Sequence, residues 1–338
     1  MARRRGWRRL GSRGRFRYVD ARGRPIADEE ALERIESLRI PPAWRDVRIA
    51  PRPYAKLQAT GVDSAGRMQY LYHPDFRARQ EQAKFDKLVR FAEKLPDLRA
   101  AMAEHISLDP LEPEWTAALA VRLINLGWFR VGDARYARKF RTFGITTLRK
   151  SHVKVRGSRI TFCFRSKHRA LVRTAVVDAE LAEAMRELKS MKGGRVLFRY
   201  RNGDGLCNLT GRRLNEYIQE HMGDDFTAKD FRTWGGTLIA AIAFAEHGAS
   251  ETETEAKRVI ASVMRNVGER LGNTPAVARA SYVSPAVIDQ YLDGRTIDDF
   301  RPRHLRIVSA RDVDLDAEEQ AVLALLRSHR NRRSRKAA

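Results

Sequence analysis

Tyr282 is the side chain best suited to nucleophilic chemistry, and it lies in the stretch from Leu271 to Pro285. A helical pattern ends at Gly272 before this stretch, and Pro285 can begin another short helix. Tyr282 is therefore expected at or beside a helix junction, where a side chain can face a ligand instead of the core. The chain has nine tyrosines. Packing is the default role for each of them, so a nucleophile must be argued from its partners.

The candidate partners are three cations and one amide, Arg130, Lys167, Arg232 and Asn273. Arg232 falls in the first turns of a predicted helix that begins with the capping box Thr227–Asp230. The positive end of the helix dipole favours an anion there. Lys167 is expected at the tip of a β-hairpin. Each residue is a weak signal alone because the chain holds 65 Lys and Arg residues, but together they could surround an anionic group with fixed positive charge.

Several other kinds of site are not indicated. The eight histidines are scattered without metal-ligand spacing, and no Walker loop is present, so we expect neither a metal nor a cofactor. The two cysteines, Cys163 and Cys207, form no disulfide framework, which favours a reducing compartment. No apolar run reaches membrane-spanning length, and the basic start lacks the apolar core of a signal peptide. A cytoplasmic, nucleoid-associated protein is the default expectation.

Charge points to a polyanionic partner. The formal net charge is +23 at pH 7, which favours nucleic acid first and an anionic membrane surface second. Residues 1–24 carry ten arginines and one acid, and we expect a flexible or partly stranded basic arm. The chain also closes on a basic tail, with six cations and no acid from Arg327. Such ends add salt-sensitive DNA affinity, although a solvated tail is the alternative.

Residues 25–78 read as a small β-rich module. A helix is predicted over residues 29–38, and strands over residues 47–49, 54–59 and 68–72. In the last strand Tyr70 and Tyr72 share one face, while Gln69 lies on the other. With the neighbouring Arg67, these groups suit DNA contact. Core packing of one of the two tyrosines is an equal alternative.

From residue 79 onward the pattern is mainly helical. Apolar residues recur at helical spacing up to Leu95, where Pro96 is expected to end the helix, and a second helix follows to Ile106. Residues 152–155, 159–164 and 170–177 read as three antiparallel strands joined by short turns. Further helices are predicted over residues 114–126, 134–140, 179–189, 210–221, 227–247, 256–270 and 286–292. The predicted fold class is α+β: a small β-rich N-terminal domain, a mainly α domain with a three-stranded sheet (residues 79–310), and a C-terminal helix with its basic tail (residues 311–338).

The order of the candidate residues and their local sequences resembles the type IB DNA topoisomerases, in particular the compact poxvirus-like enzymes found in bacteria. The similar segments include Phe129–Gly132, the hairpin Lys167, Lys229–Gly235, and Leu271–Pro275 with the pair Ser281-Tyr282. The segments Ile40–Trp44, Leu57–Gly61 and Gln69–Pro74 resemble the N-terminal domain of that family. The resemblance covers roughly residues 38–300, and both basic ends lie outside it.

The resemblance implies the catalytic fold shared by tyrosine recombinases and type IB topoisomerases, acting as a monomeric clamp on double-stranded DNA. It makes Tyr282 the nucleophile that forms a 3′-phosphotyrosyl bond and expels a 5′-hydroxyl. Arg130 and Arg232 hold the non-bridging oxygens, Asn273 donates a hydrogen bond to one of them, and Lys167 is the general acid. In the short basic helix and just after it, Lys139 and Arg141 are further candidate DNA contacts.

Two positions depart from the family pattern. Asn273 stands where viral and eukaryotic members have a histidine, so this position can donate a hydrogen bond but cannot titrate. Lys167 is followed by His168-Arg169, where many relatives have a small Ser-Gly pair. Lys154 is therefore kept as a second candidate for the general acid.

Two other function classes compete with this interpretation. A tyrosine recombinase would share the chemistry, but recombinases usually have histidine where this chain has Lys229. A non-enzymatic basic DNA-binding protein fits the net charge equally well. That class does not predict the ordered set of two arginines, a lysine and a tyrosine.

Overall fold

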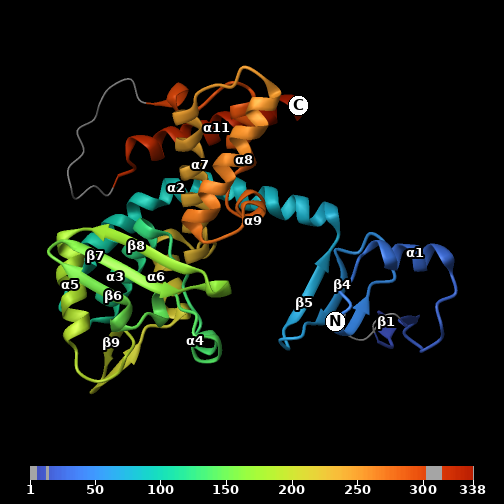
Figure 1. Cartoon of the computed structure of the whole chain (residues 1–338), viewed down its shortest axis with the longest axis horizontal. Coiled ribbons are helices and arrows are strands. Elements are labelled where there is room, and N and C mark those ends of the chain that lie inside the picture. The colour runs from blue at the N-terminus through green and yellow to red at the C-terminus, as the bar shows by residue number, and fades with distance from the viewer. Residues whose placement is uncertain (1–5, 13–14, 302–313, 338) are drawn as a thin grey trace. The chain divides into compact units, whose positions relative to one another are not determined.

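The computed structural model describes residues 6–12, 15–301 and 314–337. It contains two compact units, one ending at Lys84 and the other beginning at Phe85. The division falls inside helix α2 (Pro74–Ile106) (Figure 1). The N-terminal unit is built on a β-sheet and the C-terminal unit is mainly helical, which confirms the predicted α+β class.

The N-terminal unit is a five-stranded antiparallel sheet in the order β2-β1-β3-β4-β5. Helix α1 (Glu29–Ser37) buries Ile35 against it, together with Val47 and Ile49 from the sheet. A small core of this kind is enough to fix which face of each strand points inward. The strands are β1 (Trp7–Leu10), β2 (Arg17–Val19), β3 (Arg45–Ile49), β4 (Leu57–Val62) and β5 (Met68–Tyr72).

The basic N-terminal segment is partly stranded, which is one of the two alternatives expected for residues 1–24, but its strands belong to the five-stranded sheet. Where the structure describes it, the segment supplies β1 and β2, and β1 lies between β2 and β3. Trp7 and Tyr18 pack against the buried core of this unit. Burial of the apolar surface of these two rings stabilises the strands, although the sequence around them is rich in arginine. Residues 1–5 and 13–14 of the expected arm lie outside the described residues.

The C-terminal unit packs helices against one face of a three-stranded antiparallel sheet (Figure 1). Among the described residues, no helix has the length and apolar composition needed to cross a membrane. The helices after α2 are α3 (Pro113–Gly127), α4 (Ala134–Phe140), α5 (Ala179–Ser190), α6 (Gly211–Met222), α7 (Ala228–His247), α8 (Glu253–Leu271), α9 (Pro275–Ser281), α10 (Pro285–Leu292) and α11 (Ala317–Ala337). Short 3₁₀ helices span Ile145–Thr147, Lys150–His152, Lys167–Arg169 and Ile297–Phe300.

The three predicted strands are confirmed as β6 (Val153–Arg156), β7 (Arg159–Arg165) and β8 (Leu171–Val177). Side chains of β7 alternate strictly between buried and exposed, as expected for a sheet with one covered face. Phe162 and Phe164 lie on the covered face, where both rings contact Phe129. The β7–β8 hairpin holds Lys167 at its tip, as the sequence predicted.

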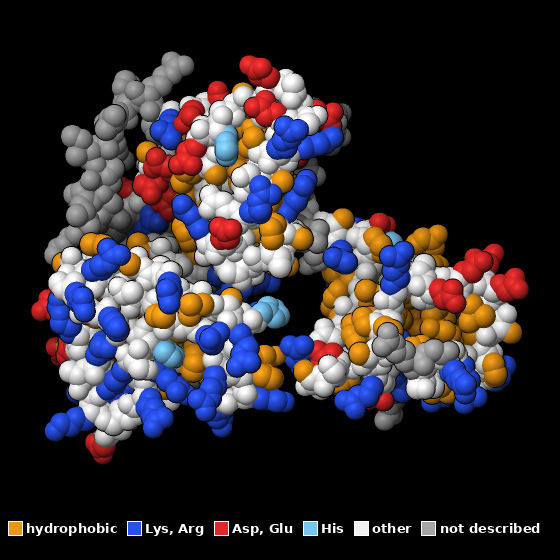
Figure 2. All heavy atoms as spheres, in the orientation of Figure 1, with side chains coloured by type: hydrophobic (Ala, Val, Ile, Leu, Met, Phe, Trp, Pro, Cys, Tyr) orange, Lys and Arg blue, Asp and Glu red, His pale blue; other side chains and the backbone are white. Residues whose placement is uncertain are grey.

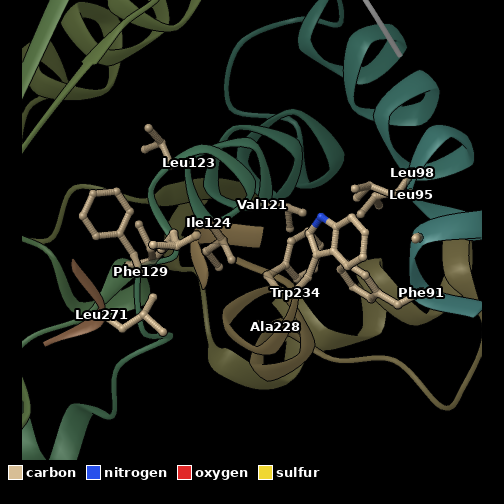
Figure 3. Packing of buried hydrophobic residues seen from close by; sticks show 14 of the residues in the cluster. Phe91, Leu95, Leu98, Val121, Leu123, Ile124, Phe129, Ala228, Trp234 and Leu271 are labelled. Carbon is tan, nitrogen blue, oxygen red and sulfur yellow. The ribbon is translucent and has the colours of Figure 1, made fainter. Parts of the chain in front are cut away.

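The main core of the C-terminal unit lies where α2, α3 and α7 meet (Figure 3). The Trp234 side chain is 2% exposed and contacts the ring of Phe91 from α2. Phe129 and Leu271 lie in the same cluster, further from α2 (Figure 3). The residues on either side of Arg130, and those that follow Arg232 on α7, are therefore fixed by the same body of packed side chains.

Pro96 does not end its helix, which was the prediction. Helix α2 continues through it to Ile106. Proline inside a helix removes one hydrogen bond and crowds the carbonyl four residues back, at a cost of about 3 kcal/mol. The flanking Leu95 and Leu98 are both completely buried, and burying a leucine stabilises by about 1.5–3 kcal/mol. The free energy gained by burying the leucines on both sides of Pro96 therefore exceeds the cost of keeping proline inside the helix.

A second hairpin, β9 (Arg199–Asn202) with β10 (Gly205–Asn208), was not predicted. Gly205 pairs with Asn202, which leaves a two-residue turn at Gly203 and Asp204. Gly203 adopts a φ of 59°, the left-handed region that such tight turns require. The Gly-Asp pair is a recognised two-residue hairpin signal and could have identified this element.

The C-terminal residues form helix α11, which packs into the main core through an apolar stripe that includes Val322, Leu325 and Leu326. Its Glu319 accepts two hydrogen bonds from Arg99 of α2 and one from Trp234 of α7. The predicted helix is present, and it belongs to the same compact unit as the rest of residues 85–338. The predicted boundary between residues 310 and 311 lies outside the described residues.

Candidate active site

Tyr282 occupies the junction between two short helices, as expected. It is the C-terminal cap of α9, and α10 begins three residues later. The Thr274 side chain caps the start of α9 by accepting from Val277 N at 3.3 Å. The Tyr282 backbone is thus held on both sides, while its side chain remains partly exposed.

Arg232 lies in the second turn of α7 and is almost fully buried, with 5% of its surface exposed. The predicted capping box is present: Thr227 N donates to the Asp230 carboxylate at 2.8 Å. The Arg232 guanidinium donates to Trp128 O at 2.5 Å and to Leu271 O at 2.7 Å. Its Nε atom is buried without a hydrogen-bond partner in the described structure. A buried donor left unpaired costs about 1–3 kcal/mol, so this position favours an additional acceptor.

Arg130 follows α3 in an extended segment, beyond a left-handed cap at Trp128. Its guanidinium donates to Asn273 Oδ1 at 2.7 Å, to Gly272 O at 3.1 Å and to Leu271 O at 3.3 Å. The structure thus brings together two residues that are separated by 143 positions in the sequence. The Asn273 amide is oriented by this contact, which leaves its Nδ2 group as a donor.

The end of α8 is the common support of this cluster. Leu271 O accepts from both guanidiniums and from Asn273 Nδ2, the last at 3.3 Å. Carbonyl groups at the C-terminus of a helix carry partial negative charge and attract cations. Gly272 then turns the chain with a φ of 61°, a left-handed conformation that glycine adopts without strain. The helix end therefore holds two positive groups side by side without using a carboxylate.

The two guanidiniums repel each other. Burial and the neighbouring charge of Arg232 lower the pKa of Arg130 to about 10. Burial likewise lowers the pKa of Arg232, although Tyr282 opposes that shift. Within the described part of the chain, carbonyl, amide and phenol oxygens are the acceptors around both groups. An anion bound here would relieve the repulsion, because it would bring the missing negative charge.

Tyr282 lies against this positive pair. The guanidinium carbon of Arg232 is 5.1 Å from the centre of the Tyr282 ring. Burial raises the pKa of Tyr282, but Arg232, Arg130 and Lys229 together outweigh burial, so the net pKa of the phenol is below its usual value. A lower pKa makes the phenolate, the nucleophilic form, easier to reach.

Two residues of α7 fix the backbone of Tyr282, and the sequence analysis missed both. Thr237 Oγ1 donates to Tyr282 O at 3.3 Å and accepts from Ser284 N at 3.1 Å. A Cβ atom at Gly236 would lie 2.7 Å from Tyr282 O, so only glycine allows this approach. The Gly-Gly pair inside a helical pattern is the signal that could have drawn attention to this contact.

Lys167 is placed differently from the other four residues. It is exposed at the tip of the β7–β8 hairpin. Among the described residues, no hydrogen bond or ion pair joins its side chain to Tyr282, Arg130, Arg232 or Asn273. The next two residues, His168 and Arg169, both have left-handed φ values of 58° and 61°. The alternative residue Lys154 is exposed in the middle of β6.

A pocket of about 320 Å³ lies beside the two guanidiniums. The end of α3 and the end of α8 form part of its wall, and the tip end of the β7–β8 hairpin forms another part. Arg130 and Arg232 line it, together with Ser166, which precedes Lys167 in the hairpin turn. The hairpin that carries Lys167 therefore adjoins the cationic pair.

The candidate DNA-binding residues of β5, with Arg67 just before it, divide into an exposed pair and a pair that contacts Asp63. Tyr70 and Tyr72 are 51% and 37% exposed, and their rings stack at 6.3 Å between centroids. Both tyrosines are thus available for binding, and the alternative that one belongs to the core is wrong. Gln69 and Arg67 instead donate to the Asp63 carboxylate at 2.8 Å each.

The other two candidates lie at the end of α4, a helix with no buried residue. Lys139 is exposed, with its Nζ atom 5.3 Å from the ring centre of Phe140. Arg141 is exposed and caps the helix in a left-handed conformation. The described residues contain no group of three or more His, Cys, Asp or Glu side chains arranged to hold a metal ion.

Comparison with known proteins gives two family matches. Residues 73–296 match the family described as eukaryotic DNA topoisomerase I, catalytic core, and residues 15–63 match the bacterial DNA topoisomerase IB N-terminal domain. DNA topoisomerase 1B of Acanthamoeba polyphaga mimivirus is 33% identical over 268 residues, covering 77% of this chain and 80% of the viral protein. DNA topoisomerase 1B of vaccinia virus (strain Copenhagen) is 22% identical over 282 residues, covering 81% of this chain and 86% of the relative.

Proposed function

This chain belongs to the type IB DNA topoisomerases, and we propose that it relaxes supercoiled duplex DNA through a transient 3′-phosphotyrosyl bond to Tyr282. The observation that carries the proposal is the convergence of Tyr282, Arg130, Arg232 and Asn273 at the end of α8. Neither a tyrosine recombinase nor a non-enzymatic DNA-binding protein is favoured, because both family matches are to topoisomerases.

In the proposed cleavage step, the Tyr282 phenol loses its proton to water, and the phenolate oxygen attacks the phosphorus of a backbone phosphodiester. The bond between phosphorus and the 5′-oxygen breaks, and a 5′-hydroxyl strand leaves. Arg130 and Arg232 stabilise the equatorial oxygens of the pentacoordinate transition state, and Asn273 Nδ2 donates a hydrogen bond to one of them. The unpaired Nε atom of Arg232 supplies one more donor for the phosphate.

Lys167 is the proposed general acid. An alkoxide at a 5′-carbon is a poor leaving group, so the departing oxygen needs a proton. An exposed lysine at a hairpin tip can reach a bound backbone from outside the cluster. The phenol, with an ordinary pKa of about 10, leaves phosphorus more easily, so religation is favourable. One phosphodiester bond is exchanged for another, and we therefore propose that neither ATP nor a metal ion is needed.

We further propose that the N-terminal unit contacts the same duplex and that the protein acts as a monomeric clamp. Tyr70 and Tyr72 present a stacked aromatic pair on the exposed face of β5. Lys139 and Arg141 on the C-terminal unit supply exposed charge for phosphate contacts. Arg67 and Gln69 would first have to exchange their contacts with Asp63. In the cell, such a protein would be cytoplasmic and associated with the nucleoid.

The test is the substitution Tyr282→Phe. The variant is expected to lose plasmid relaxation and covalent protein–DNA adducts completely, because no other oxygen occupies the position of the phenol. DNA binding should remain close to that of the unmodified protein, measured by fluorescence anisotropy on a labelled duplex. Tyr200→Phe is the matched control, and it should relax plasmid normally. Relaxation by the Tyr282→Phe variant would exclude the proposed nucleophile.

A further inference from the structure

The three-stranded sheet of the C-terminal unit has one face that no other described element covers, and we call it the open face. Buried side chains of β7 point to the other face, where α5 also packs. The outward residues of the three strands are all exposed. They are Lys154, Arg156, Arg159, Thr161, Cys163, Arg165, Leu171, Arg173, Ala175 and Val177.

The charge of the open face is of one sign. Five of its ten residues are Lys or Arg and none is acidic. Within the described residues, none of these five cations forms an ion pair with a carboxylate. Helix α5, on the other side of the sheet, instead exposes Glu180, Glu183 and Glu187. Figure 2 shows Lys and Arg side chains (blue) over this part of the molecule, with Asp and Glu at its margin.

The arrangement of these cations has a cost in stability. Arg156 and Arg159 are direct partners across β6 and β7. Like charges placed opposite each other in a sheet are destabilising. A general need for solubility would be met equally well by interspersed charges of both signs. The uniform sign therefore points to a polyanionic partner.

The open face is continuous with the candidate active site. Strand β8 is an edge strand, and Leu171, Val172 and Arg173 line the pocket beside Arg130 and Arg232. From this end the face follows the strands away from the hairpin tip. The six steps along β7 correspond to about 20 Å at 3.3 Å per residue. A nucleic-acid strand has one phosphate per 3.4 Å of helix axis, so this length matches about six of them.

We propose that the open face binds the phosphate backbone of the flank of the duplex that is held in the active site. This inference rests on the proposed function, because it assigns to the cleaved duplex a path along the sheet. Arg165 would contact a phosphate at the active-site end of the face, and the paired Arg156 and Arg159 would contact phosphates at its far end, while Leu171 and Val177 exclude water between the charges. The contact is independent of base sequence, since it involves only phosphate groups.

A native cysteine makes the proposal testable. Cys163 lies in the middle of the open face, opposite Arg173. The chain has only one other cysteine, Cys207, which is on β10 and serves as the internal control. The rate of alkylation by N-ethylmaleimide would be measured at each thiol by mass spectrometry, with the Tyr282→Phe variant so that the DNA stays uncleaved. Duplex DNA is expected to slow the reaction of Cys163 several-fold and to leave that of Cys207 unchanged.

The stoichiometry of protection identifies the source of the phosphate groups. Protection that is complete at one linear duplex per protein supports the flank of the bound duplex. Protection that begins only with excess duplex would show binding of a second DNA segment, and the proposal would be wrong in its partner. Equal alkylation of Cys163 with and without DNA would overturn the proposal entirely.

Charge removal gives a second measurement. The double variant Arg156→Gln/Arg159→Gln should reduce the slope of log binding constant against log salt concentration by about 2, at about 0.9 per lost phosphate contact. The matched control Arg201→Gln/Arg258→Gln removes two exposed charges elsewhere on the same unit and should change the slope less. Adduct formation by Tyr282 at saturating DNA should be normal in both, so a failure of this inference would leave the proposed function intact. Equal slopes in the two double variants would contradict the inference.

Discussion

The cluster at the end of α8 and the tip of the β7–β8 hairpin carry positive charge in opposite ways. Arg130 and Arg232 are held by backbone carbonyls, and Arg232 is almost fully buried. Lys167 is exposed and projects from a turn whose next two residues are in the left-handed region. One part of the site is therefore built before DNA arrives, and the other has freedom to adjust.

This difference suits two different chemical tasks. A group that stabilises transition-state charge is most effective when it is already in place, because no reorganisation is then needed during the reaction. A proton donor must meet one oxygen of the leaving strand within hydrogen-bond distance. The position of that oxygen depends on the bound duplex. A hairpin tip can follow it, whereas a buried arginine cannot.

The largest expected effect concerns Lys167. Lys167→Ala should slow cleavage by about 10²–10⁴-fold, the usual contribution of a general acid. A substrate with sulfur in place of the leaving 5′-oxygen should restore the rate, because a thiol of pKa about 8.5 leaves without a proton. Single-turnover adduct formation measures both rates. Lys154→Ala is the matched control, and if the sulfur substrate rescued that variant instead, Lys154 would be the acid.

A substitution at Arg232 should also slow cleavage, but the sulfur substrate should not restore the rate. Arg232→Lys removes the planar pair of donors that contacts Trp128 O and Leu271 O, and one ammonium cannot replace both. Cleavage should fall about 10²–10³-fold. The sulfur substrate should not restore it, since transition-state charge and not the leaving group is affected. If the same substrate restored the rate of Arg232→Lys, the proposed difference between charge stabilisation by the α8 cluster and proton donation by the hairpin tip would be wrong.

A substitution at Gly236 tests the backbone support of Tyr282, the proposed nucleophile. In Gly236→Ala, the new methyl group would meet Tyr282 O and Tyr282 Cβ, at 2.7 and 2.9 Å without relaxation. Displacement of a reacting group by about 1 Å can cost about 10²-fold in rate. We expect up to that loss in adduct formation with DNA affinity unchanged. Ala240→Gly, a change in the same helix away from Tyr282, controls for helix stability, and equal rates in the two variants would count against the backbone contact.

The smallest expected effect is a shift in pH dependence. Cleavage should rise with pH up to the pKa of Tyr282, which lies below its usual value because Arg232, Arg130 and Lys229 outweigh burial. Lys229→Gln removes one of these charges and should move the inflection to higher pH without abolishing activity. The measurement is the single-turnover rate on the sulfur substrate, which removes any contribution from Lys167. An unchanged inflection would indicate that a different group titrates.

Much of the local structure could be predicted from the sequence. The capping box at Thr227, the helix end at Gly272 and the three strands of the C-terminal sheet all appear as expected. Each depends on residues that are close together in the chain. The placement of Tyr70 and Tyr72 on one face of β5 and of Gln69 on the other also followed from alternation alone, whereas the exposure of the tyrosine face did not.

The failures have a common origin in packing between distant segments. Pro96 continues a helix because the leucines on both sides are buried in the main core. The arginine-rich N-terminal segment enters the sheet because Trp7 and Tyr18 find an apolar surface there. Local preferences are worth a few kcal/mol at most, and burial of several side chains exceeds them.

The sequence alone determined the types and order of the proposed catalytic residues, and the helix junction that presents Tyr282. Only the tertiary structure decided what holds them. Leu271 O supports both guanidiniums, Gly236 and Thr237 fix the backbone of Tyr282, and Lys167 lies outside the cluster. The reason is that backbone carbonyls and close approaches carry no residue-specific signal. Their role appears only when folding brings α7 and the end of α8 into contact.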